Sequence, residues 1–128
     1  SIEIHHIFPR SWCQKEQKDE RFFESILNKT AISGRANRTI GGNAPSKYIP
    51  SLEKRFDFDQ KQMDQVLQSH LINPEALRND DFETMIQDRR KRLLQMISQA
   101  MGKDVVSGTD AEGGEEIVYN EEEVYMFT

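Results

Sequence analysis

The stretch Ser1-Ile2-Glu3-Ile4-His5-His6-Ile7-Phe8-Pro9 opens the chain and carries two of its three histidines side by side. Apolar and polar residues alternate up to His5, and the stretch contains three β-branched isoleucines, a pattern that predicts a β-strand. Pro9 ends the strand because it has no N–H to donate to a sheet. Neighbouring side chains of a strand point to opposite faces, so His5 and His6 can do different work. One can hold a metal ion while the other handles a proton.

The length and composition set the frame for this strand. The chain has 128 residues, of which 36% are hydrophobic, and this predicts one domain with a modest core. Cys13 is the only cysteine, which excludes an internal disulfide and a Cys-x-x-Cys zinc site and predicts a cytoplasmic protein. No apolar run is long enough to cross a bilayer, so we expect no association with a membrane.

The charge of the chain is unevenly distributed. The formal net charge is −5, yet residues 110–128 hold seven acidic side chains and no basic one. Residues 1–55 hold ten basic and six acidic side chains, a surplus of four positive charges. The end that carries the paired histidines therefore has the sign that a phosphate-binding surface needs.

After the opening strand, the sequence predicts helices and one further strand. Apolar spacing, N-capping residues and Gly or Pro breaks indicate where each element begins and ends. Ser46 is the expected N-cap of the helix after Gly41-Gly42, and Pro50 is expected to kink that helix. The expected elements are a helix over 19–27 capped by Asp19, a strand over 30–33 antiparallel to the first, and helices over 33–40, 46–56, 59–71 and 80–101.

Four polar residues follow a known order along this pattern. His5 and His6 lie on the first strand, Asn28 comes just before the second, and Asn37 lies in the helix that follows. In this order and spacing they resemble the HNH nuclease motif of the ββα-metal fold. Three segments, over 25–30, 37–46 and 69–102, more narrowly resemble the C-terminal nuclease domains of GmrSD-type bacterial restriction and anti-phage proteins.

The resemblance covers roughly residues 2–103, and it implies a larger protein. In that family a ParB-like nucleotide-hydrolysing domain precedes the nuclease domain. We therefore expect the chain to be a fragment that works with such an N-terminal domain or a partner chain, and we expect DNA as its substrate.

The resemblance also assigns roles to residues. His6 matches the general base, and His5 and Asn37 match the ligands of the metal ion. Asn28 is expected to hold the loop that presents His6, and Glu3 is expected to fix the tautomer of an imidazole. The candidates for contact with DNA phosphates are Arg10, Lys29, Arg35 and Arg38.

One divalent metal ion is expected at this site. Two protein ligands leave several positions for water and phosphate oxygens, which is how Mg²⁺ usually binds. Imidazole favours softer ions, so Mn²⁺, Ni²⁺ or Zn²⁺ are alternatives to Mg²⁺.

The sequence thus predicts an α+β domain that acts as a metal-dependent DNA endonuclease. Residues 1–43 would form the ββα-metal core, and residues 44–102 would form a helical extension packed on it. Residues 103–128 would form an acidic tail, either partly disordered or an edge hairpin. The alternatives are a catalytically inactive DNA-binding or scaffold module of the same fold, and a toxin-type nuclease.

Overall fold

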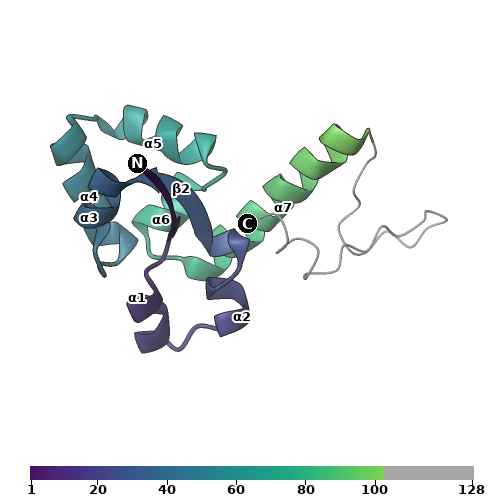
Figure 1. Cartoon of the computed structure of the whole chain (residues 1–128), viewed down its shortest axis with the longest axis horizontal. Coiled ribbons are helices and arrows are strands. Elements are labelled where there is room, and N and C mark those ends of the chain that lie inside the picture. The colour runs from purple at the N-terminus through teal and green to yellow at the C-terminus, as the bar shows by residue number, and fades with distance from the viewer. Residues whose placement is uncertain (103–128) are drawn as a thin grey trace.

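Two short strands pair antiparallel in the computed structural model, which describes residues 1–102 (Figure 1). Strand β1 covers Ile2–His6 and strand β2 covers Lys29–Ser33. The register places His5 opposite Thr30 and His6 opposite Lys29. The remaining elements of the described part are helical, so the expected α+β class is confirmed. The tail expected over 103–128 lies outside the described residues.

The helices surround this sheet in chain order. Between the strands come α1 (Arg10–Lys15), α2 (Glu20–Phe23) and a 3₁₀ turn, η1 (Ile26–Asn28). After β2 come α3 (Gly34–Ile40), α4 (Pro45–Phe56), α5 (Gln60–Ser69), α6 (Pro74–Arg78) and α7 (Phe82–Met101). In Figure 1, α3, α4 and α5 lie on one side of the sheet, and the far end of α7 projects away from the body. No helix among residues 1–102 is long and apolar enough to cross a membrane.

Short side chains cap most of these helices, as the sequence predicts. The Asp19 carboxylate accepts from Arg21 N–H, and the Ser33 hydroxyl accepts from Ala36 N–H. The helix expected over 19–27 is nevertheless shorter than predicted. It ends at Phe23, because the Ser25 hydroxyl accepts from Leu27 N–H and starts the separate 3₁₀ turn.

Two expectations about α4 are wrong. The helix begins at Pro45 with Ala44 at the N-cap, and it continues through Pro50 to Phe56. A proline is well suited to the first helical position because its missing N–H would have no partner there. Ser46 instead donates from its backbone N–H and its hydroxyl to the Asp80 carboxylate, at 2.8 and 2.6 Å. The expected cap is therefore a bond between α4 and the turn before α7.

The core joins the two halves of the described chain. Phe8 is fully buried, and its ring lies 4.9 Å from Trp12 and 5.3 Å from Phe82 between ring centroids. The Tyr48 hydroxyl donates to the Ile7 carbonyl over 2.6 Å. A two-stranded sheet is not stable alone in water. The strands therefore depend on the helices that follow them in the chain.

The long helix α7 departs from the expected apolar stripe. Met96 is 49% exposed, although the periodicity placed it on the buried face. Arg89, expected on a solvated face, is buried and donates to the carbonyls of His70 and Ile26. Burial lowers the pKa of this guanidinium from 12.5 to about 10. The first half of α7 thus connects the end of α5 to the 3₁₀ turn.

The pH dependence of stability is expected to involve His70. Its Nδ1 lies 2.7 Å from Thr30 Oγ1, and burial together with the charge of Arg89 lowers its pKa below 6.5. Below pH 6.5 the native state then binds fewer protons than the unfolded state, so the free energy of unfolding falls as the pH decreases. We expect His70→Gln to make this loss smaller in denaturant titrations between about pH 7.5 and pH 5.

Thr30→Val provides the control for this prediction. It removes the hydrogen bond but keeps the titrating imidazole, so it should lower the free energy of unfolding by about 1 kcal/mol at both pH values. An unchanged pH dependence in His70→Gln would contradict the assignment to His70.

Candidate functional site

Asn28 holds the chain immediately after the paired histidines. Its side chain is fully buried, with Oδ1 accepting from Phe8 N–H at 2.8 Å. Its Nδ2 donates to the carbonyls of Phe8 and Phe23 at 2.9 and 3.0 Å. The Asn28 carbonyl accepts in turn from Ile7 N–H at 2.7 Å. The loop that follows His6 therefore has its backbone direction set by one amide side chain.

His6 contacts a carboxylate that the sequence did not point to. Its Nε2 lies 3.0 Å from Glu24 Oε1, and Arg10 Nε lies 3.5 Å from the same oxygen. Glu24 is the C-cap of α2 and precedes the turn that supplies Asn28. If His6 is neutral, its Nε2–H donates to Glu24 and its Nδ1 is left free to accept a proton. No spacing signal predicts this pair, because the partners are 18 residues apart.

His5 faces the other side of the strand, as the alternation predicts. Residues opposite each other in an antiparallel pair share a face, so His5 lies with Thr30 and His6 with Lys29. Glu3 shares the face of His5, and its Oε2 accepts from Asn37 Nδ2 at 3.3 Å. Glu3 therefore contacts the Asn37 amide, whereas the imidazole expected to be its partner is bonded to Glu24.

The candidate metal ligands thus come from β1 and α3. The donor set around this face is an imidazole nitrogen, an amide oxygen and the Glu3 carboxylate, which suits a divalent ion of borderline hardness. No group of three or more His, Cys, Asp or Glu side chains that could hold a metal occurs within residues 1–102. A site here would therefore depend on the Asn37 oxygen and on water.

The four cations expected to contact phosphates fall into separate groups. Lys29 lies opposite His6 across the hairpin, and Arg10 lies beside Glu24. Arg38 is exposed on α3. Arg35 lies at the end of α3 that faces α4, with its guanidinium carbon 5.4 Å from the centre of the Phe56 ring. The structure therefore places Lys29 and Arg10 near His6 and leaves Arg35 with α4.

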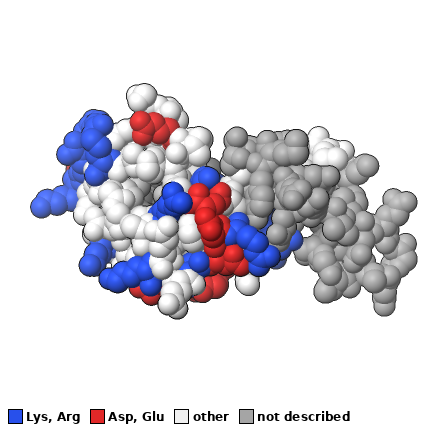
Figure 2. Space-filling model, turned by 60° about the horizontal axis from the view of Figure 1, so that its bottom comes forward, with Lys and Arg blue, Asp and Glu red and all other residues white. Residues whose placement is uncertain are grey.

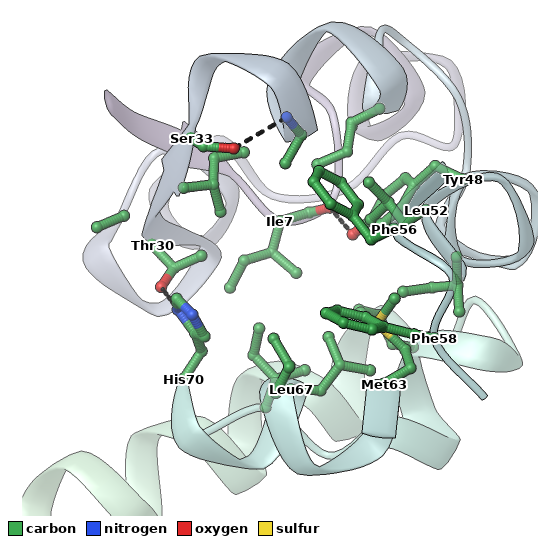
Figure 3. A pocket seen from close by; sticks show the side chains of 18 of the residues that line it. Ile7, Thr30, Ser33, Tyr48, Leu52, Phe56, Phe58, Met63, Leu67 and His70 are labelled. Carbon is green, nitrogen blue, oxygen red and sulfur yellow. Dashed lines mark hydrogen bonds between the residues drawn. The ribbon is translucent and has the colours of Figure 1, made fainter. Parts of the chain in front are cut away.

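An apolar cavity lies behind the sheet. It has a volume of about 550 Å³ and is bounded by β2, α3, α4 and α5 (Figure 3). Leu52, Phe56, Met63 and Leu67 supply much of its wall, and the Thr30–His70 pair is a polar point on it. Such a lining does not suit phosphate. The polar groups that could act on DNA therefore lie on the hairpin and its loop.

Comparison with known proteins finds one archaeal relative at a significant level. Protein MJ0686 of Methanocaldococcus jannaschii, described as uncharacterized, is 30% identical over 117 residues, which cover 75% of this chain and 20% of the relative. The chain thus spans about a fifth of the length of that curated relative. No family model matches the chain, and no solved structure matches it. The chain is therefore similar to a protein whose description states no activity.

The role of Asn28 in the fold can be tested by truncation. Asn28→Ala removes three buried hydrogen bonds and leaves the Phe8 N–H without its partner. Because each unsatisfied buried group costs about 1–3 kcal/mol, we expect the free energy of unfolding to fall by roughly 3 kcal/mol or more. Denaturant titration followed by circular dichroism measures this change.

Asn43→Ala is the matched control, since Asn43 is exposed and makes a single 3.3 Å bond to the Ile40 carbonyl. Its truncation should cost less than about 1 kcal/mol. An equal cost for the two variants would show that Asn28 does not hold the loop.

Proposed function

We propose that this chain contains an HNH-type nuclease domain of the ββα-metal fold that hydrolyses DNA phosphodiester bonds with one divalent metal ion. The observation that carries the proposal is the buried Asn28 side chain. It closes the loop after His6 within a strand, turn, strand and helix that also bear His5 and Asn37. These four residues are the ones on which the resemblance to the HNH motif depends.

His6 would act as the general base. It would accept the proton of the attacking water at Nδ1, because Glu24 takes the hydrogen bond from Nε2. Glu24 would also stabilise the imidazolium that forms. The pair is only partly exposed, with side-chain accessibilities of 23% for His6 and 32% for Glu24, which favours a hydrogen bond that survives in water.

His5 and Asn37 would hold the metal ion. Their elements are brought together at the 3.3 Å contact between Asn37 and Glu3, so ligand atoms of nitrogen and oxygen type are close to one another. A bound divalent ion would supply positive charge to the phosphate and to the departing oxygen. Lys29 and Arg10, at the His6 end of the hairpin, would orient the phosphate chain.

We propose further that the domain serves within a longer bacterial restriction or anti-phage protein in the cytoplasm. The chain spans about a fifth of its archaeal relative, which supports a role as one module among several. A ParB-like domain or a partner chain would then select the DNA to be cut.

Loss of the general base should abolish most cleavage. We expect His6→Ala to reduce the rate of plasmid nicking with Mg²⁺ or Mn²⁺ by about 10²–10⁴-fold, the usual contribution of general-base catalysis. Glu24→Gln should reduce the rate by roughly tenfold, because the imidazole loses the partner that orients it. Glu16→Gln removes an exposed carboxylate of the same type and should leave the rate unchanged. A His6→Ala variant that nicks as fast as the wild type would refute the assignment.

Metal binding should separate the two histidines. Calorimetric titration with Mn²⁺ should show weaker binding, by roughly 10-fold or more, for His5→Ala and for Asn37→Ala, because each removes a proposed ligand. His6→Ala should bind Mn²⁺ as the wild type does. If His6→Ala weakens binding as much as His5→Ala, the division of labour proposed for the pair is incorrect.

A further inference from the structure

The segment formed by α3 and α4 differs in charge from the rest of the chain. Residues 34–56 hold five basic side chains and one acidic side chain, Glu53, although the whole chain has a net charge of −5. The basic residues, called the α3–α4 face below, are Arg35, Arg38, Lys47, Lys54 and Arg55.

The cations of the α3–α4 face are not neutralised by neighbours. All five are exposed, and none makes an ion pair with a carboxylate among the described residues 1–102. Glu53 does not offset them, because its Oε2 lies 3.1 Å from Arg78 Nη2 on α6. The surplus of positive charge is therefore available to an external anion.

The two helices bring part of this charge to one place. Arg35 of α3 lines a shallow, open depression of about 450 Å³ together with Ser51, Lys54 and Arg55 of α4. The Arg35 guanidinium also lies over the Phe56 ring, which limits its freedom of movement. Three cations and a hydroxyl around an open depression suit the charge and the oxygen atoms of a phosphate group.

The face adjoins the candidate site. Helix α3 starts directly after β2 and carries Asn37, so the same short helix borders both the hairpin and the cationic depression. Figure 2 shows Lys and Arg side chains gathered on the side of the molecule that α3 and α4 occupy in Figure 1, with many of the visible acidic side chains nearer the middle. A polyanion lying on the hairpin can therefore continue onto this face.

We propose that the α3–α4 face binds the phosphate backbone of duplex DNA that flanks the bond at the candidate site. This inference rests on the proposed function, which it extends by naming the surface that holds the substrate. The large hydrophobic side chains exposed within residues 1–102 all lie outside 34–56, so the face has no apolar anchor for a lipid surface. Backbone contacts of this kind are independent of base sequence and weaken steeply with salt.

Binding without cleavage tests the proposal. The whole chain is titrated against a fluorescent duplex of about 20 base pairs in EDTA, and anisotropy is measured at several salt concentrations. The test variant combines Arg35→Gln, Lys54→Gln and Arg55→Gln. The matched control combines Lys61→Gln, Arg90→Gln and Lys91→Gln, which removes the same charge from exposed positions on α5 and α7.

The test variant should bind roughly 30-fold more weakly at about 50 mM salt, and the slope of log K against log salt should fall by about 2.7, as for three lost phosphate contacts. The control should change affinity by less than about threefold, and both variants should keep the circular dichroism of the wild type. A protein that binds duplex through this face but does not nick plasmid DNA would refute the nuclease function and leave this inference standing.

Three outcomes would overturn the inference. Equal losses in the two variants would mean that only net charge matters, and an unchanged affinity in the test variant would exclude the face from contact. Binding to vesicles that contain phosphatidylglycerol, lost in the test variant and not in the control while binding to the duplex is retained, would assign the face to a lipid surface.

Discussion

The buried amide of Asn28 is the interaction on which the candidate site depends. One side chain satisfies a backbone N–H and two carbonyls from segments that meet only in the folded protein. Inside a protein, such groups are costly to leave unpaired, so the amide sets the path of the loop after His6 with little freedom. The direction of the paired histidines follows from this local geometry.

Helices that come later in the chain support the same turn. The Arg89 guanidinium of α7 donates to the Ile26 carbonyl of η1, two residues before Asn28, and to the His70 carbonyl at the end of α5. His70 in turn bonds Thr30 of β2, which lies opposite His5. A hairpin too small to be stable alone is thus tied to α5 and α7 by polar contacts as well as by the apolar core.

Charge divides the surface according to the work we propose for it. A carboxylate, Glu24, sits beside His6, where an imidazole has to be oriented, and α3 and α4 carry unpaired cations. The apolar cavity lies behind the sheet and takes no part in this arrangement. The polar chemistry and the packing of the domain therefore use opposite sides of the same two strands.

Much of the local structure follows from the sequence by itself, because it depends on neighbours a few residues apart. Alternation determined the opposite faces of His5 and His6, and short polar side chains at 19, 33, 59 and 81 determined where helices start. Only the tertiary structure decided the Glu24–His6 pair, the burial of Arg89 and the meeting of Arg35 with α4. These contacts join residues 18 or more positions apart, and nothing in local periodicity specifies which distant side chain packing will bring within reach.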